Sequence, residues 1–136
     1  MLTLYSQALA VKAIQSQTIQ TGTTDGAVLD LSQYGNNSRD ILFVVHSATL
    51  TDGTYAISVE ESDQSGSGFV AVDSGRIGGS LPSFAASDDN TWKSFGVRPT
   101  KRYVKLVVTA TGATTGGVLA GTAVLGNGSV NPVARS

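Results

Sequence analysis

The sequence lacks cysteine altogether, and histidine and tryptophan each occur only once in its 136 residues. The missing thiols exclude disulfides, thiolate metal sites and cysteine nucleophiles. One histidine cannot build a histidine-rich metal site, and a site made of carboxylates alone would suit calcium or magnesium. We therefore expect neither cysteine chemistry nor a transition-metal centre.

Charge and long hydrophobic runs are also scarce. Charged residues make up 14% of the chain, against about 25% in a typical soluble domain. The longest uninterrupted apolar run is Ile41–Val45, which is far too short to span a membrane. The first residues have no basic segment followed by an apolar stretch of signal-peptide length. The sequence therefore predicts a soluble protein that is made in the cytoplasm and does not bind membranes.

The few charges are unevenly distributed along the chain. All ten acidic residues lie between Asp25 and Asp89. The residues from Asn90 onward include no acid and six bases, namely Lys93, Arg98, Lys101, Arg102, Lys105 and Arg135. Late strands that pack against early ones would bring the opposite charges together inside the fold. Alternatively, two poles of opposite sign meet between subunits or on a larger scaffold.

Hydrophobic periodicity is the main structural signal. Thr54–Glu61 alternates cleanly, with Tyr55, Ile57 and Val59 on one face. Similar short segments, separated by turn residues, are expected at 9–20 (either a strand with a bulge or an arm that feeds a strand), 26–31, 41–48, 69–73, 91–97, 102–110 and 118–125. Residues 74–90 are expected to be irregular. About eight strands in a chain of one-domain length predict an all-β, single antiparallel β-sandwich. A jelly-roll-like topology leads, with galactose-binding-like and immunoglobulin-like sandwiches as alternatives.

The strand pattern also predicts the core and the limits of the domain. The expected core includes Val28, Leu29, Phe43, Val45, Tyr55, Ile57, Val59, Val104, Leu106 and Val108, with Trp92 or Phe95 facing inward as well. The sandwich is expected over residues 9–126, between an N-terminal arm (1–8) and a C-terminal arm (127–136). Each arm carries apolar or rigid anchors, namely Leu2, Leu4 and Tyr5, and Val130, Pro132 and Val133. Free termini are usually polar and frayed, so such anchors predict that a partner surface orders the arms.

Candidate catalytic chemistry is sparse. His46 lies within an apolar strand, where packing explains it better than a Ser-His-Asp arrangement. The clusters Glu60-Glu61-Ser62-Asp63 and Asp88-Asp89-Asn90 lack the spacing of a calcium loop, so we interpret them as solvated loop acids. The glycines of Thr111–Gly117 mark a turn, and no phosphate-binding GxxxxGK motif occurs. We predict no catalytic, cofactor-binding or metal-binding residues, and no enzyme.

Two surface features could still bind a partner. Lys101, Arg102 and Lys105 surround Tyr103, but they support nucleic-acid binding only weakly in a chain of pI about 5.6. We expect them instead to match an acidic protein neighbour. The tryptophan and the tyrosines could line a sugar platform, although core packing is commoner for strand aromatics.

Several segments together resemble a family of small virion structural proteins of tailed bacteriophages, which are similar to head decoration (cement) proteins. The most specific are LTDGTYAISVEESD, from Leu50 to Asp63, and KRYVKLVVTATGATTGG, from Lys101 to Gly117. The shorter ALAVKAIQSQTI, GAVLDLSQY and FAASDDNTWKSFGV extend the resemblance over most of residues 8–126. These motifs are strands and turns, so the resemblance carries fold and family, with no catalytic residue to transfer.

The resemblance implies a non-enzymatic protein on the capsid exterior that binds and stabilises the shell of the major capsid protein. Many weak, equivalent contacts on a symmetric shell would supply the avidity. Self-association is expected too, as a homodimer first, because two-fold contacts are the commonest closed symmetry, and as a trimer otherwise. No small-molecule substrate or nucleic-acid partner is expected. A carbohydrate-binding β-sandwich module, or another virion component at the head–tail junction or in the tail, is the alternative.

Overall fold

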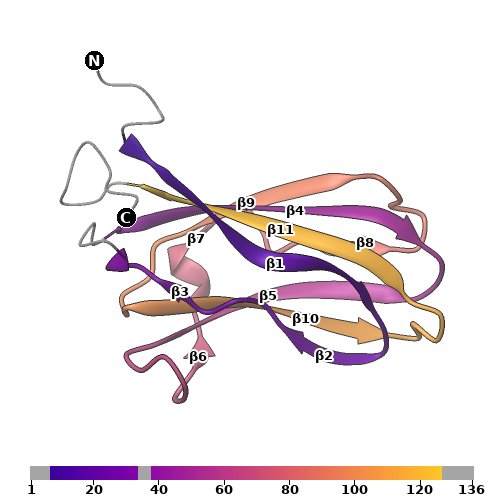
Figure 1. The fold of residues 1–136 in the computed structure, drawn as a ribbon, viewed down its shortest axis with the longest axis horizontal. Helices are drawn as coiled ribbons and strands as arrows, with labels where there is room; N and C mark the ends of the chain where they lie inside the picture. Colours follow the sequence, from indigo (N-terminus) through magenta and orange to yellow (C-terminus); the bar gives the residue numbers. More distant parts are fainter. Residues whose placement is uncertain (1–6, 34–37, 127–136) are drawn as a thin grey trace.

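Eleven β-strands and a 3-10 turn, η2 (Ser74–Arg76), build the chain in the computed structural model, which describes residues 7–33 and 38–126 (Figure 1). Most of the two predicted arms lies outside these ranges, and so do the following residues singled out above: Leu2, Leu4, Tyr5, Tyr34, Val130, Pro132 and Val133. No helix within 7–33 and 38–126 has the length and apolar character needed to cross a bilayer.

The strands form two antiparallel sheets. The five-stranded sheet has the order β1 (Leu9–Ile19), β11 (Gly117–Gly126), β4 (Asp40–Leu50), β9 (Trp92–Val97) and β7 (Ile77–Gly78). The six-stranded sheet has the order β2 (Gly22–Asp25), β10 (Tyr103–Thr111), β5 (Thr54–Ser62) and β6 (Val70–Ala71), with β3 (Leu29–Asp30) paired to β10 and β8 (Ser83–Ala85) paired to β5. The two sheets pack face to face, as Figure 1 shows.

The strand order is that of a jelly roll. β2 and β3 both pair with β10 and act as one interrupted strand. With β7 and β8 set aside as short additions, one sheet contains the first, eighth, third and sixth strands in chain order, and the other contains the second, seventh, fourth and fifth. That arrangement is a double Greek key, the jelly-roll topology. The predicted fold class is confirmed.

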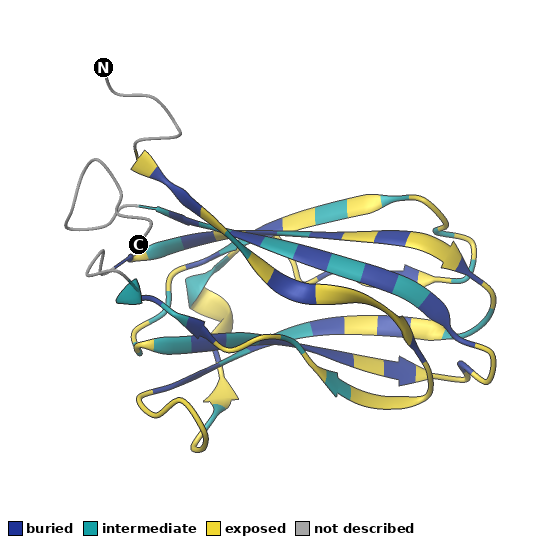
Figure 2. Cartoon of the chain, viewed as in Figure 1, coloured by how far each residue is buried: buried dark blue, intermediate teal, exposed yellow. Residues whose placement is uncertain are grey.

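The core lies between the sheets and follows the alternation seen in the sequence (Figure 2). On β5, Tyr55, Ile57 and Val59 are buried, while the residues between them are exposed or half-buried. Phe43 and Phe95 lie opposite each other on β4 and β9, and their ring centroids are 5.3 Å apart. Nine of the ten residues predicted for the core are buried; the exception is Val28.

Two expectations about inward-facing residues are corrected or resolved. Val28 is 42% exposed, because its neighbour Leu29 pairs with Val104 and occupies the inward position. Adjacent residues of an extended segment point to opposite sides, so Val28 faces outward. The same rule resolves β9, where Phe95 is buried and Trp92 is 65% exposed.

Three further outcomes concern the strand boundaries. The bulge expected in the first strand is present, because the pairing of β1 with β11 shifts register twice between Lys12 and Gln17. The strand β2 was not predicted, since Gly22–Asp25 is short and has no apolar residue. Residues 74–90, expected to be irregular, contain η2, β7 and β8. Phe84 anchors this segment in the core and is fully buried.

Candidate functional site

One end of the sandwich gathers the points where both predicted arms join the body. Leu9, at the start of β1, lies opposite Leu125 near the end of β11. Gly126 lies opposite Asp40, at the start of β4. β9 ends and β10 begins at this end, so the connection at residues 98–102 is also there. We call this region the arm end, and the opposite end, which holds the β4–β5 and β10–β11 connections between the two sheets, the loop end.

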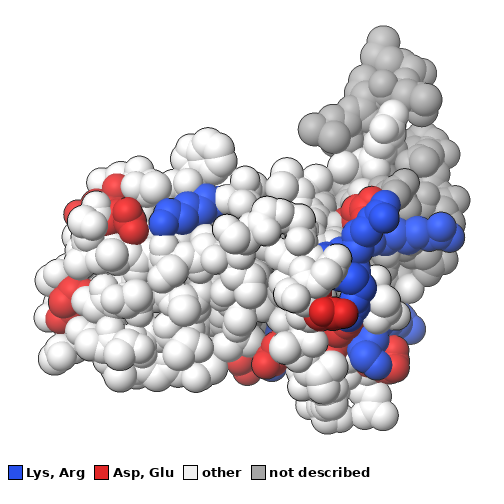
Figure 3. Space-filling model, turned by 180° about the vertical axis from the view of Figure 1, so that it is seen from behind, with Lys and Arg blue, Asp and Glu red and all other residues white. Residues whose placement is uncertain are grey.

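Ion pairs cluster at the arm end. The guanidinium of Arg102 donates two hydrogen bonds to Asp30, of 2.9 and 3.0 Å. Arg98 Nε lies 2.9 Å from an Asp40 oxygen, and Lys101 Nζ lies 3.3 Å from Asp63. Figure 3 shows charges of both signs side by side at this end. The hydrogen bond from Arg102 holds the pKa of Asp30 below its usual value, so this pair is charged at neutral pH.

The predicted basic residues are therefore brought together, and each has an acidic partner in its own chain. Lys105 lies further along β10, with its Nζ 3.2 Å from Asp25 and 3.8 Å from Glu60. Its ammonium also lies 4.5 Å from the centre of the Phe69 ring. Pairing of late strands with early ones thus accounts for the uneven charge distribution, which is the first of the two explanations given above. The idea that these bases also match a partner's acids stays a prediction.

Glu61 is the main site residue that the sequence analysis misjudged. It is 1% exposed rather than a solvated loop acid. Arg76 Nη1 lies 2.9 and 3.1 Å from its two oxygens, and the backbone N–H of Thr100 donates to it at 3.1 Å. Burial alone would raise the pKa of Glu61, but the hydrogen bonds from Arg76 and Thr100 outweigh it and lower the pKa. The carboxylate thus ties β5 to η2 and to the 98–102 connection.

The sequence did contain a signal for this buried carboxylate. Glu61 continues the inward parity of Tyr55, Ile57 and Val59 on β5. An acid at an inward position needs a cationic partner. Its partner Arg76 could not have been identified, because it lies in the segment for which no regular structure was expected.

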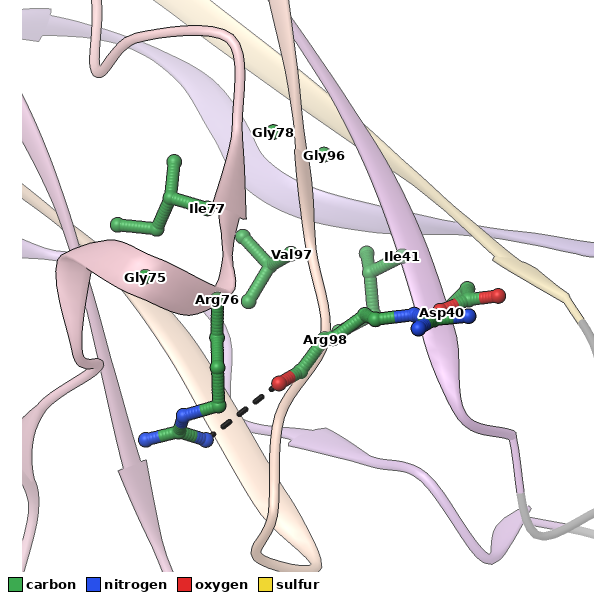
Figure 4. A pocket seen from close by; sticks show the side chains of 9 residues that line it. All are labelled: Asp40, Ile41, Gly75, Arg76, Ile77, Gly78, Gly96, Val97 and Arg98. Atoms are coloured by element: carbon green, nitrogen blue, oxygen red, sulfur yellow. Dashed lines mark hydrogen bonds and ion pairs between the residues drawn. The ribbon is translucent and has the colours of Figure 1, made fainter.

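A hollow of about 360 Å³ lies beside these ion pairs, over β4, β9 and β7 (Figure 4). Gly78 and Gly96 face each other across the β7–β9 pair and leave its floor without side chains. Arg98 and Arg76 stand at its border, and their guanidinium groups already bind Asp40 and Glu61. The hollow therefore offers backbone and apolar surface rather than unpaired charge.

At the loop end, acidic side chains accept hydrogen bonds from the backbone. Asp52 accepts them from the N–H groups of Thr115 and Gly116, at 3.1 and 2.9 Å, and so joins the β4–β5 and β10–β11 connections. Asp89 accepts one from Leu50 N, at 2.7 Å. Gly53 has φ +88°, and a Cβ there would lie 2.7 Å from the Cβ of Ala113. Within 7–33 and 38–126, no three His, Asp or Glu side chains lie close enough together to hold a metal ion.

His46 and Trp92 lie side by side on the outer face of the five-stranded sheet. His46 is exposed, so it packs on the sheet face rather than in the core. Tyr103 lies on the other sheet, and Tyr55 is fully buried. Among the described tyrosines, none pairs with Trp92 to make the coplanar platform that would favour a carbohydrate-binding module.

Comparison with known proteins gives a likeness of fold alone. No family model and no curated protein matches the chain. Among solved structures, the PBSX exported protein XepA superposes with a TM-score of 0.63 over 100% of this chain, at 12% sequence identity. The chain spans 42% of the length of XepA. A chain of infectious bursal disease virus, Gx strain, is matched over 88% of this chain and 39% of its own length, with a TM-score of 0.23 and 10% identity, and no argument rests on it.

Proposed function

We propose that this protein is a non-enzymatic structural component of a tailed-bacteriophage virion, which decorates the capsid exterior by binding the major capsid protein. The two arms are its grips, and Lys101, Arg102 and Lys105 add electrostatic matching. The protein also binds itself, as a homodimer first and a trimer otherwise. It needs no cofactor, small-molecule substrate, nucleic acid or membrane.

The observation that carries the proposal is the convergence at the arm end. Residues 1–8 and 127–136 join neighbouring strands, because Leu9 and Leu125 lie opposite each other. Lys101 and Arg102 begin the strand pair at the same end. The points where the two arms join the body and these two bases are far apart in the sequence and thus lie at one end of the sandwich, as a single attachment site requires. The loop end, by contrast, is closed by its own hydrogen bonds through Asp52 and Asp89.

Two further observations support a virion role. The motifs from Leu50 to Asp63 and from Lys101 to Gly117 resemble phage decoration proteins, and both form paired strands, β5 with β10, at the centre of the six-stranded sheet. The acids that might have served catalysis bind backbone N–H groups or arginines instead, which favours a structural role.

The direct test is copurification with phage particles. We expect the protein to remain on particles purified by density gradient, in a fixed ratio to the major capsid protein. A ratio far below that of the capsid protein would place it at the head–tail junction or in the tail. Absence from washed particles would contradict a virion role altogether.

The attachment surface is tested by truncation. Removing residues 1–6 spares the buried Ala8 and all of β1, and removing 127–136 spares all of β11. We expect each truncation to lower occupancy on particles, and the double truncation to abolish it. Full occupancy of the double truncation would mean that the sandwich body binds the capsid and the arms do not.

A matched pair of lysines tests the electrostatic part. The Lys101 side chain is 36% exposed and pairs with Asp63 at the arm end, while the Lys93 side chain is 34% exposed and pairs with Asp88 near the loop end. Lys101→Glu should lower occupancy and weaken its dependence on salt, because it removes an attraction that salt screens. Lys93→Glu should leave occupancy unchanged. Equal effects of the two would argue against a specific role for the arm end.

A further inference from the structure

The outer face of the five-stranded sheet has no Asp, Glu, Lys or Arg in the middle of its three central strands, β11, β4 and β9. Alternate residues of β11, β4 and β9 point outward there, and we call this set the uncharged face. Its members are Val118, Ala120, Thr122 and Val124 on β11, Leu42, Val44, His46 and Ala48 on β4, and Trp92, Ser94 and Gly96 on β9. The bases and acids lie at its borders, with Lys12 on β1 and the Asp40–Arg98 pair at the arm end.

Cross-strand pairing makes the uncharged face continuous. Leu42 lies between Val124 and Gly96, and it is 46% exposed. In the next-but-one row, His46 lies between Ala120 and Trp92. Contiguous apolar surface of this kind marks interaction sites on soluble proteins. The face thus has the character of a protein interface.

The shape of this face is complementary to itself, because it has both a projection and a hollow. Trp92 projects at one end of β9 and is 65% exposed. The hollow of about 360 Å³ lies at the other end of β9, where Gly96 and Gly78 leave the sheet without side chains (Figure 4). An indole ring needs less space than this hollow provides. Projection and hollow are four residues apart on one strand, about 13 Å, and both lie on the outward side.

We propose that the uncharged face binds a second copy of this chain about a two-fold axis near Ser94, so that Trp92 of each copy enters the glycine hollow of the other. A two-fold contact requires one patch to complement itself, and a projection and a hollow on either side of the axis meet that requirement. Because the patch carries no charge, two copies meet without like-charge repulsion.

The area fits a modest dimer contact. Strand length and spacing give the outer side of β11, β4 and β9 about 440 Å² in each copy, or about 900 Å² for two. Interfaces below about 1,200 Å² are typical of weak, transient association, so we expect a dimer whose population depends on concentration. The inference rests on the proposed function for its self-association and names the surface for it, but it does not require capsid binding.

The test is the mass of the purified full chain in solution, by light scattering over a range of concentrations. We expect a particle of twice the 13.9 kDa chain. Trp92→Ala removes the projection, and Leu42→Glu places a charge in the middle of the contact. Each should raise the dimer Kd at least about 100-fold. Val70→Glu is the matched control, because Val70 is 52% exposed on β6 of the other sheet, and it should leave the Kd unchanged.

Gly96→Leu distinguishes a contact that depends on shape complementarity from nonspecific hydrophobic association. A Cβ at Gly96 would meet nothing nearer than the Ile41 carbonyl oxygen, at 3.8 Å, so the fold accepts a side chain there. Leucine would fill the hollow and exclude the partner's Trp92, and we expect a monomer although the face has become more apolar. Thermal melts by circular dichroism check that each variant is folded. If Leu42→Glu does not fold, Trp92→Ala and Gly96→Leu decide.

Several outcomes would overturn the inference: a wild-type monomer, an assembly of three or more chains, or a wild-type Kd in folded Leu42→Glu or Gly96→Leu. A monomer that loses capsid occupancy with Leu42→Glu would assign the face to the capsid. A dimer that responds to the variants but does not bind phage particles would sustain this inference and contradict the capsid role. The two proposals thus fail separately.

Discussion

The outer faces of the two sheets use charge in opposite ways. On the six-stranded sheet, Lys105 of β10 lies between Asp25 of β2 and Glu60 of β5, so opposite charges alternate across three strands. On the five-stranded sheet, the corresponding rows contain alanine, valine, leucine and tryptophan, as in the row from Ala120 through His46 to Trp92.

The outer face of the six-stranded sheet is therefore suited to contact with water, whereas the outer face of the five-stranded sheet is suited to contact with a partner. A face whose charges pair within one chain is stable in water without a partner. An uncharged face gains free energy when it leaves water, at roughly 25 cal/mol for each Å² of apolar surface buried. The sandwich thus has one outer face whose charges are paired within the chain and one outer face that is suited to assembly.

The comparison presumes that both faces cover one common core, and the largest expected effect tests this. Leu106 on β10 is fully buried between the sheets. Leu106→Ala should lower the free energy of unfolding by about 2–5 kcal/mol, because it leaves a cavity. Thr109→Ala, at an exposed position of the same strand, should change it by less than about 0.5 kcal/mol. Chemical denaturation measures both, and equal effects would contradict the sandwich.

The second-largest expected effect on stability concerns the buried carboxylate of Glu61. Glu61→Gln keeps the shape of the buried side chain but leaves Arg76 without its counter-charge. Because the Arg76 side chain is 28% exposed and can regain water, we expect a loss of about 2 kcal/mol, below the range for a fully buried pair. Denaturation at neutral pH measures this loss, and a loss below about 0.5 kcal/mol would mean that the pair only fills space.

The pH dependence of the same variant sharpens the assignment. The folded pKa of Glu61 lies below its ordinary value of 4.5, so its stabilising contribution is complete above about pH 4.5 and is lost as the pH falls through the folded pKa. The difference in unfolding free energy between wild type and Glu61→Gln should therefore shrink in acid. A difference that stays constant down to the folded pKa would rule out the ionised carboxylate as its cause.

A pair of lysines, one on each outer face, measures the contrast itself. The Lys105 side chain is 15% exposed among its two acids, while Lys12 is exposed and has no ion pair within the described part of the chain. Lys105→Met should cost about 0.5–1 kcal/mol, and Lys12→Met less than about 0.5 kcal/mol. High salt should narrow the gap, because it screens the Lys105 pairs. Equal losses in low salt would remove the distinction between the faces.

Much of the fold could be predicted because the strands obey local rules. Tyr55, Ile57 and Val59 alternate with polar residues, so their burial follows from the period of an extended chain. β2 was not predicted, because Gly22–Asp25 has no apolar residue and is held by pairing with β10, which is distant in the sequence. Val28 was placed inside because both it and Leu29 are apolar, and the choice between them depends on register, which a single segment does not specify.

The interaction surfaces were harder to predict, for a related reason. The charged residues could be named, but the pairing of Arg102 with Asp30 depends on which strands become neighbours. The uncharged face arises from three strands, of which β9 comes from a segment whose inward residue was left open between Trp92 and Phe95. Predicting a surface that spans several strands requires the sheet topology, whereas predicting which residues of one strand face the core does not.

The smallest expected effect concerns His46, in the middle of the uncharged face. Its ring is exposed between Ala120 and Trp92, so His46→Gln, which keeps a neutral polar group of similar size, should change the free energy of unfolding by less than about 0.5 kcal/mol. Capsid occupancy should be unchanged. A hidden metal site would behave differently, because a metal that binds the folded state raises the melting temperature. Thermal melts with and without divalent metal ions therefore decide: a metal-dependent rise that disappears in His46→Gln would contradict a purely structural role for this histidine.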